Sequence, residues 1–444
     1  MIFHPVYLAI LILIVWMWKK RWLSSLIVTL SGYIFAASFV SLPTLPEEGA
    51  AVHGKFIPTS LSYSHSPFGT SYLLKGSLNR IPCQIYIPKH KTRPRCDHSF
   101  HVEGKLLPKK FPNYVLKPTI LEPIPNTFSL AEWRFQIKDK LRHHFQSLFS
   151  SPETSSFLLS MVTGELDDRL MSLQFNRLGL LHLLGVSGFQ FSLLAVLLGA
   201  LLRITLPGSK GTVVLILFLT LYAFTLGHSP PIERAWVGSI LFAIARRFGL
   251  PLSPLNSLGT ALIFCLLLDP CVIFQLGFQF SFLCTGAIFI VYPVLRQFFL
   301  RYLPARSLSE IRLLPMLDRV GVVFAAFCRE SIALNIAIHL VSLPLIFFHF
   351  HKFPLLSLAY NLFLPPVVSL AYFFLILGFL FPPFLWISGA ITTGMIHIAQ
   401  NPPTLFDFQW RFPSLTFSWA VLTITLILWF FYKRSRFFNS TLGT

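Results

Sequence analysis

The apolar segment 180–190 carries the residues of this chain that could do chemistry inside a membrane. They are a histidine, a serine, a glutamine and two glycines: His182, Gly185, Ser187, Gly188 and Gln190. The imidazole can carry a proton, and the hydroxyl and amide can form hydrogen bonds. Polar side chains and broken helix backbone are costly in hydrocarbon, so they are tolerated chiefly where they line a cavity. We therefore expect an unwound, cavity-lining segment, with a small-residue helix-packing face as the alternative.

The composition is that of a polytopic membrane protein. Of the 444 residues, 54% are hydrophobic and 12% are charged, whereas soluble domains carry about 25% charged residues. Hydropathy therefore predicts a mostly α-helical chain of about 11 transmembrane helices. The expected spans are 6–18, 23–42, 180–203, 211–227, 232–247, 255–268, 274–295, 331–348, 355–381, 384–400 and 415–432.

Basic residues in the short loops predict the orientation of these spans, because lysine and arginine concentrate on the cytoplasmic side. The basic clusters are Lys19-Lys-Arg21, Arg203 with Lys210, Arg246-Arg247, the stretch Arg296 to Arg312, and Lys433-Arg434 with Arg436. All of them fall on one side of the predicted membrane. Residues 43–179 then lie outside and the C-terminus lies in the cytoplasm. The chain is expected to begin with two transmembrane helices over 1–42 and to end in a basic cytoplasmic tail over 433–444.

The segment 43–128 is predicted to fold as a small β-rich domain on the outer side. Short stretches of alternating character, such as Cys83-Gln-Ile-Tyr-Ile87, are separated by proline and glycine, which is typical of a barrel or sandwich. Cys83 and Cys96 both lie in this domain. A disulfide between them is possible in an oxidising compartment, and two unpaired thiols are the alternative.

A basic patch is expected on the surface of this outer region. Residues 43–150 include 15 Lys and Arg against 7 Asp and Glu. The candidate nucleic-acid contacts are Lys89, Lys91, Arg93, Arg95, Lys109 and Lys110, interleaved with Phe100, Phe111 and Tyr114. Basic grooves with aromatic platforms suit a phosphate backbone and stacked bases. A solvated loop attracted to anionic lipid is the alternative.

Residues 129–175 are expected to form amphipathic linker helices. Over 131–149, apolar residues such as Trp133, Phe135 and Leu141 recur among Lys, Arg and His. This pattern predicts a helix that lies on the membrane surface, with a helix packed on the core of the outer domain as the alternative.

Further polar motifs follow in order along the apolar part of the chain. They are Gly164-Glu-Leu-Asp-Asp-Arg169, Ser229-Pro-Pro-Ile-Glu-Arg-Ala235, Pro254-Leu-Asn-Ser-Leu258, Asp269-Pro270, Gly277-Phe-Gln-Phe-Ser-Phe282, Leu343-Pro-Leu-Ile-Phe-Phe-His-Phe-His351 and Tyr360-Asn-Leu-Phe-Leu-Pro-Pro366. Together with the segment 182–190, their order and spacing resemble the membrane domain of the ComEC competence family, from about Gly164 to Val368.

The resemblance implies a channel domain over 176–432 that admits single-stranded transforming DNA through the bacterial cytoplasmic membrane. The DNA pathway would include His182, Ser187, Gly188, Gln190, Arg234, Gln279, Ser281 and Asn361. Gln190 stands where the family usually has a histidine, and glutamine cannot carry charge. The resemblance also implies that the outer domain is of the OB-fold type.

The expected partners are single-stranded DNA, membrane lipid and an outer DNA receptor. No Gly-x-x-x-x-Gly-Lys-Ser/Thr motif is present, so a separate cytoplasmic ATP-driven motor is expected. Many relatives continue into a metallo-β-lactamase-like domain. Here Lys352 and Phe353 follow His349-Phe-His351, and no Asp-His completes the zinc ligands. A separate nuclease is therefore expected if one strand is degraded.

Two other functions are alternatives to a DNA channel. In a transporter of a small solute or lipid, the broken helix would hold the substrate at mid-depth and the basic domain would be a membrane-surface anchor. In a membrane-embedded hydrolase, Ser187 would be the nucleophile and His182 the base. The spacing disfavours the hydrolase, because Gly-x-Ser-Gly lacks the final spacing of the Gly-x-Ser-x-Gly elbow. We therefore expect no catalytic residue, metal site, cofactor or enzymatic activity.

Overall fold

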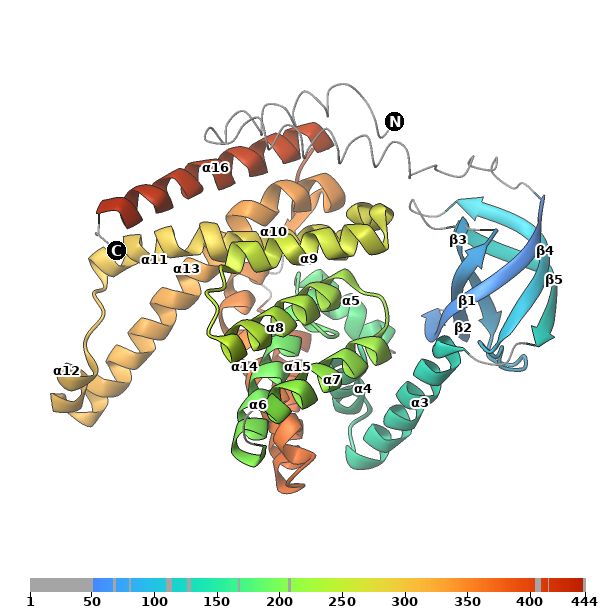
Figure 1. Ribbon diagram of the computed structural model, residues 1–444, viewed down its shortest axis with the longest axis horizontal. Helices are drawn as coiled ribbons and strands as arrows, with labels where there is room; N and C mark the ends of the chain where they lie inside the picture. Colours follow the sequence, from blue (N-terminus) through green and yellow to red (C-terminus); the bar gives the residue numbers. More distant parts are fainter. Residues whose placement is uncertain are drawn as a thin grey trace.

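A computed structural model describes residues 51–441, except 67–68, 80, 109–113, 126–128, 167, 207–208, 404–408 and 414. A small β-barrel is followed by a mostly helical region, and the helix α3 lies between them (Figure 1). The predicted mostly helical chain with a small β-rich domain is confirmed. The predicted spans 6–18 and 23–42 lie outside the described residues.

The barrel is built from five strands in the order β1-β2-β3-β5-β4, and β4 pairs with β1 to close it. Neighbouring strands are antiparallel except β3 and β5, which pair in parallel. The strands are β1 (Ala51–Ser66), β2 (Gly69–Leu78), β3 (Ile81–Pro88), β4 (His98–Pro108) and β5 (Tyr114–Pro125).

Alternating side chains explain why these segments form a barrel. In β3, the side chains of Cys83, Ile85 and Ile87 are buried and those between them are more exposed, as the two-residue period of a strand requires. β4 bulges at Gly104, where a Cβ would collide with the carbonyl oxygen of Lys117 on β5. Glycine therefore lets these two strands approach each other closely.

Cys83 and Cys96 are buried in the barrel core as two free thiols. The two sulfurs are unpaired in this structure, and the choice between a disulfide and two thiols stays a prediction. Both side chains pack with the other apolar side chains of the barrel interior.

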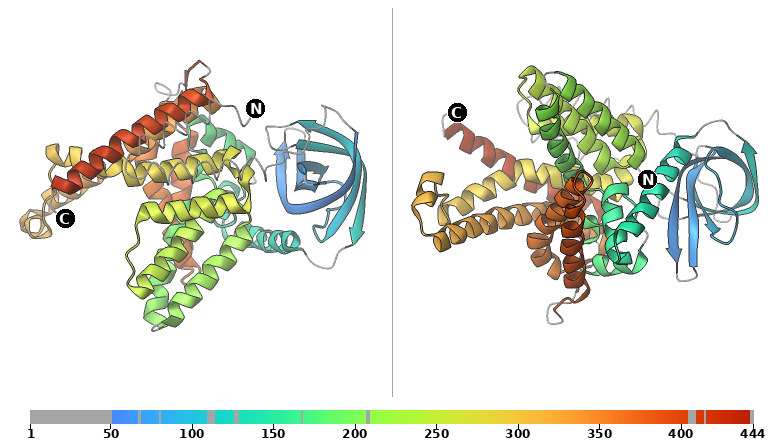
Figure 2. Two further views of the ribbon diagram at one scale, coloured as in Figure 1. Left: turned by 45° about the horizontal axis from the view of Figure 1, so that its top comes forward. Right: turned by 90° about the horizontal axis from the view of Figure 1, so that it is seen from below.

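Helices make up most of the remaining chain (Figure 2). They are α3 (Leu130–Leu148), α4 (Pro152–Thr163), α5 (Arg169–Arg177), α6 (Gly188–Thr205), α7 (Ser209–Leu226), α8 (Pro230–Phe248), α9 (Pro254–Leu268), α10 (Leu276–Ile290), α11 (Tyr292–Tyr302), α12 (Leu308–Leu313), α13 (Met316–Phe350), α14 (Leu356–Gly378), α15 (Pro383–Gln400) and α16 (Phe417–Thr441), with short 3-10 turns η1 (Leu181–Leu183) and η2 (Pro270–Phe274).

Four of the described helical segments are long and apolar enough to cross a membrane. They are Leu181–Thr205, Ser209–Leu226, Met316–Phe350 and Leu356–Gly378, and the bent pair α10 and α11 would make a fifth. The other predicted spans in the described residues also fall on helices, but the count of 11 transmembrane helices stays a prediction. α13 begins at Met316, well before the predicted start at 331.

The helical region packs around several apolar clusters. One joins α3, α4, α5, α14 and α15 and includes Phe145, Phe157 and Tyr372. α3 also inserts Ala131 and Phe135 into the barrel core. The apolar side chains of α3 therefore pack against protein at both ends of the helix. This agrees with the alternative of a core-packed helix and not with a helix on the membrane surface.

Two short strands join the segment after α13 to the segment before α16. β6 (Lys352–Pro354) follows α13, and β7 (Gln409–Arg411) precedes α16. They pair antiparallel, with Phe353 opposite Trp410, and the N–H of Phe412 donates to the carbonyl of His351 at 2.9 Å.

The buried thiols give a pH-dependent prediction. Burial raises the pKa of the Cys83 thiol to about 11 and that of the Cys96 thiol to about 12. Because the thiolate is the reactive form, we expect iodoacetamide at pH 8 to modify neither residue in the folded chain. Both should react after unfolding in urea without a reductant. Residue-resolved mass spectrometry measures this, and resistance to alkylation in the unfolded chain would indicate a disulfide instead.

Candidate functional site

The polar segment 180–190 contains the 3-10 turn η1, a non-helical stretch over 184–187 and the start of α6. α5 ends at Arg177, and α6 begins only at Gly188. The Oγ of Ser187 accepts a hydrogen bond from the backbone N–H of Gln190 at 3.2 Å, and Gln190 Oε1 accepts one from the N–H of Ser187 at 2.7 Å. This reciprocal pair is a capping box. The predicted helix break is present, and two of its polar side chains stabilise the start of α6.

The guanidinium of Arg234, on α8, lies against the start of α6. Its Nε donates to the Oγ of Ser281 on α10 at 2.8 Å. A Cβ at position 188 would collide with its Nη2, so glycine leaves the room that the arginine occupies. The neighbouring Glu233 pairs with His228 instead. Three helices therefore meet around one half-buried positive charge.

We call the start of α6 at Gly188, together with Arg234 and Ser281, the cationic spot. The backbone N–H groups at the start of a helix carry partial positive charge. Arg234 adds a full charge at the same place, and it forms no ion pair with a carboxylate in the described ranges of the chain. Helix starts and arginine side chains both bind phosphate and carboxylate oxygens. The chemistry available here is the binding of an anion.

A second polar contact joins α10 to α13. Nε2 of His349 lies 2.8 Å from Oε1 of Gln279, whose Nε2 donates to the carbonyl of Ile273 at 2.8 Å. Gln279 and Ser281 are two residues apart on α10. The motif Gly277-Phe-Gln-Phe-Ser-Phe282 thus supplies one side chain to this contact and one to the cationic spot.

A third polar group lies between α13 and α14. Nδ2 of Asn335 donates to the carbonyl of Leu358 at 2.8 Å, and the ring of His339 contacts the backbone of Asn335. Oδ1 of Asn335, Oγ of Ser357 and Oδ1 of Asn361 are buried and have no hydrogen-bond partner among the described residues. Buried oxygens of this kind need a partner such as a water molecule or a bound ligand.

Other expected pathway residues lie apart from the cationic spot. His182 lies on η1, and its side chain is at the surface of the described chain. No interaction among the described residues joins His182 or Asn361 to Arg234. Sequence reasoning missed Asn335 and His339, although two polar residues four apart within the apolar stretch 331–348 gave a signal for one helix face.

The basic residues of the outer domain separate into two kinds. Arg93 forms an ion pair with Glu132 of α3, and its guanidinium lies 4.5 Å from the centre of the Phe135 ring. Burial alone would raise the pKa of the Glu132 carboxyl, but hydrogen bonds from Arg93 and from the N–H of Cys96 lower it below its ordinary value. Arg93 therefore joins the barrel to α3.

The other described basic residues that we expected to contact nucleic acid lie at the surface of the barrel. Lys89, Lys91 and Arg95 are exposed, and the ammonium of Lys89 lies 5.6 Å from the centre of the Tyr63 ring. Lys109 and Lys110 lie outside the described residues.

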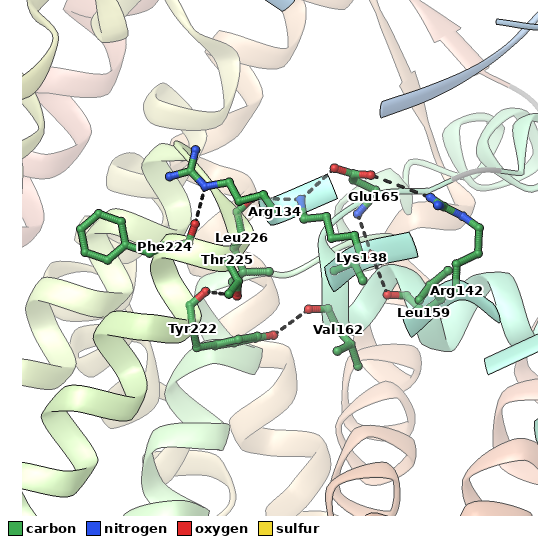
Figure 3. Close-up of polar contacts among 11 residues, drawn as sticks. Arg134, Lys138, Arg142, Leu159, Val162, Glu165, Tyr222, Phe224, Thr225 and Leu226 are labelled. Carbon is green, nitrogen blue, oxygen red and sulfur yellow. Dashed lines mark hydrogen bonds and ion pairs between the residues drawn. The ribbon is translucent and has the colours of Figure 1, made fainter. Parts of the chain in front are cut away.

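Two basic side chains of α3, Arg134 and Lys138, donate hydrogen bonds to the end of α7, and a third, Arg142, lies near Glu165 (Figure 3). Nε of Arg134 donates to the carbonyl of Phe224 at 2.5 Å. Nζ of Lys138 donates to Glu165 at 2.7 Å and to the carbonyl of Leu226 at 3.2 Å. Cations are favoured at the C-terminal end of a helix. We call Arg134, Lys138, Arg142 and Glu165 the α3 clamp.

Arg142 extends the α3 clamp to the barrel. It pairs with Asp139 at 3.1 Å and lies 3.9 Å from Glu165, and its guanidinium is 4.4 Å from the centre of the Tyr63 ring on β1. The hydroxyl of Tyr63 donates to Asp139 at 3.3 Å. Burial, together with the charge of Asp139, raises the pKa of Tyr63 to about 12.

More than half of this chain is similar to proteins of a known family. A family model described as "Competence protein" matches residues 162–437. ComE operon protein 3 of Bacillus subtilis (strain 168) is 24% identical over 294 residues, which are 65% of this chain and 31% of that relative. The chain therefore spans about a third of the length of this relative. No solved structure matches.

The α3 clamp gives a prediction about stability. The side chains of Lys138 and Glu165 are only 10% and 21% exposed. Lys138→Met leaves the carboxylate of Glu165 and the carbonyl of Leu226 without the ammonium, which we expect to cost about 3 kcal/mol. Lys140→Met is the matched control, because Lys140 is exposed on the same helix. Thermal unfolding of the detergent-solubilised full chain measures both, and equal midpoints would show that the clamp contributes nothing.

Proposed function

This chain belongs to the Competence protein family, and we propose that it is a channel for the import of single-stranded DNA across the bacterial cytoplasmic membrane. The observation that supports the proposal most directly is the cationic spot. A half-buried arginine without an acidic partner among the described residues lies there beside the start of a broken helix. Such a place suits a polyanion better than a neutral solute.

The cationic spot explains how a phosphate group would leave water. A phosphodiester loses its hydration when it enters a bundle of apolar helices, which is unfavourable unless donors replace the water. The guanidinium of Arg234 is such a donor, and the start of α6 adds partial positive charge beside it, although Ser187 already accepts from the N–H of Gln190. Gln279, Asn335 and Asn361 would offer neutral hydrogen-bonding groups further along the path.

We propose that the outer domain over 43–128, whose described strands form the barrel, receives the strand on the outer side of the membrane. A five-stranded closed barrel is the architecture of OB-folds, which bind oligonucleotides. Exposed Lys89, Lys91 and Arg95 would contact the phosphate backbone, whereas Arg93 is engaged with α3. Residues 129–175 would link this domain to the channel domain over 176–432, and the basic tail over 433–444 would be cytoplasmic.

The proposed channel needs other proteins. An outer receptor would deliver DNA, and a cytoplasmic ATP-driven motor would move the strand. A separate nuclease would degrade the other strand. In this proposal the chain itself carries no enzymatic step.

Replacing the central arginine tests the pathway. We expect Arg234→Ala to lower the appearance of external DNA in the cytoplasm by about tenfold or more, because one charge-assisted phosphate contact is lost. The measurement is uptake of labelled DNA in a deletion strain complemented with the variant at equal membrane abundance. Arg246→Ala is the matched control, since Arg246 is exposed at the other end of α8.

The same assay tests the position of the arginine as well as its charge. Gly188→Ala places a Cβ where the guanidinium lies and should reduce uptake, whereas Gly286→Ala on α10 meets no atom within 4 Å and should not. Normal uptake by both Arg234→Ala and Gly188→Ala would remove the cationic spot from the pathway.

The outer domain gives a separate prediction about affinity. The full chain in detergent should bind single-stranded DNA with an affinity that falls steeply with salt. Replacing Lys89, Lys91 and Arg95 together by glutamine should reduce the slope of log affinity against log salt by about 2. Lys140→Gln is the control. A chain that binds DNA with no salt dependence, or not at all, would favour a transporter of a small anionic solute, whose broken helix would use the same cationic spot.

A further inference from the structure

Two of the aromatic side chains that we expected to stack with bases are buried in the barrel. Phe100 is 4% exposed and Tyr114 is 9% exposed, and both belong to the barrel core. Phe111 lies outside the described residues. A buried ring cannot stack with a base that arrives from water. Stacking on this barrel therefore requires a different aromatic side chain.

Tyr86 on β3 is an aromatic side chain at the outer surface of the barrel. Cys83, Ile85 and Ile87 point into the core, so the two-residue period of the strand directs Tyr86 outward. Tyr86 is 38% exposed, and no other Phe, Tyr or Trp side chain in the described barrel strands is as exposed. An exposed aromatic ring beside cations is the arrangement that binds single strands of any sequence.

The neighbours of Tyr86 on this surface are neutral or basic. Leu73 of β2 lies directly opposite Tyr86, and Lys75 lies opposite Gln84. Lys75 is thus a diagonal neighbour of Tyr86, within reach of a long side chain. Leu73 and Lys75 point outward because Leu74 between them is buried. We call Leu73, Lys75, Gln84 and Tyr86 the β2–β3 face.

The charge of the chain differs between two parts of the barrel. Residues 98–125, which include β4 and β5, contain four Lys at 105, 109, 110 and 117, together with Glu103 and Glu122. Residues 69–96, which include β2, β3 and the loop after β3, contain no Asp or Glu. Their six basic residues are Lys75, Arg80, Lys89, Lys91, Arg93 and Arg95. The part of the barrel that carries Tyr86 is therefore the more favourable part for a polyanion.

The chemistry of the β2–β3 face indicates which partner would cover it. α3 packs against the barrel mainly at β1 and at the core. A membrane anchor needs a broad apolar area beside its cations, whereas Tyr86 has one apolar neighbour across the strand pair, Leu73. Nucleic acid supplies phosphates for the cations and base rings for the tyrosine. The face therefore suits nucleic acid better than lipid.

We infer that the β2–β3 face is a base-stacking platform that makes the outer domain selective for single strands. An unpaired base stacks on the ring of Tyr86, and Lys75 meets a neighbouring phosphate. In a duplex the base faces are stacked on each other, so a duplex offers the platform only its phosphates. Every base has a π-face, so binding is independent of sequence. This inference rests on the proposed function, since it concerns the domain that receives the strand.

The affinity of the full chain in detergent for three probes tests the inference. The probes are a strand of about 12 nucleotides, within the site size of one OB-type barrel, an abasic strand of equal length and charge, and a duplex closed by a hairpin at each end. We expect Tyr86→Ala to weaken binding of the first strand about tenfold, through loss of one stacking contact. It should leave the affinities for the abasic strand and for the duplex unchanged.

Matched variants separate the ring of Tyr86 from charge and from folding. Tyr86→Trp keeps an aromatic ring and should keep the affinity. Ile120→Ala is the control and should change no affinity, because Ile120 is 39% exposed on β5 and lies opposite Glu103. Lys75→Gln should reduce the slope of log affinity against log salt by about 1, whereas Tyr86→Ala should leave that slope unchanged.

The outcomes distinguish this inference from the proposed function. Salt-dependent binding of the strand that Tyr86→Ala leaves unchanged, or weakens equally for the abasic strand, would overturn the platform and leave the proposed channel standing. Absence of any binding of the strand by the unchanged chain would overturn both. Loss of binding to phosphatidylglycerol vesicles in Tyr86→Ala, with the strand affinity unchanged, would overturn the inference and identify the face as a membrane contact.

Discussion

The buried positive charges of α3 are the constraint on which the arrangement of this protein depends. Lys138 and Arg142 lie between the barrel and the helical region, where an unpaired charge would be strongly destabilising. Glu165, Asp139 and the last carbonyls of α7 satisfy them. Because α8 begins four residues after α7 ends, this junction also fixes where α8 starts. Arg234 lies one turn into α8, so the contacts of α3 with the end of α7 bear on its position.

The polar and small residues at the start of α6 have two different structural roles. Ser187 and Gln190 are used by the capping box that starts α6, so their polarity does not by itself imply contact with a substrate. Gly188 has a different role, since its missing side chain admits the guanidinium of Arg234. In this apolar stretch, Ser187 and Gln190 stabilise the start of α6. Gly188 instead leaves room for the charged side chain of Arg234.

Much of the fold follows from short-range pattern, whereas the site does not. Alternation predicted a β-rich barrel or sandwich from stretches such as Cys83-Gln-Ile-Tyr-Ile87, and hydropathy placed segments such as 211–227 and 384–400 on real helices. Hydropathy did not predict that α13 starts at Met316, because the charges of Arg329 and Glu330 interrupt the apolar run without interrupting the helix. Lys138 contacts Glu165 and Leu226, which lie far from it in the sequence. The spacing of the basic residues of α3, one at every fourth position, indicates a common helix face but not the partners of that face.

The short pair of β6 and β7 has a mechanical consequence. It ties the end of α13 by main-chain hydrogen bonds to the segment just before α16. Sliding α13 along its own axis would rupture these bonds together with the contact between Phe347 and Phe412, whose ring centres are 4.0 Å apart. These contacts therefore oppose movement of α13, the longest helix of the described chain, along its own axis. A movement that widens an opening beside α13 would therefore have to come from rotation of the neighbouring helices about α13.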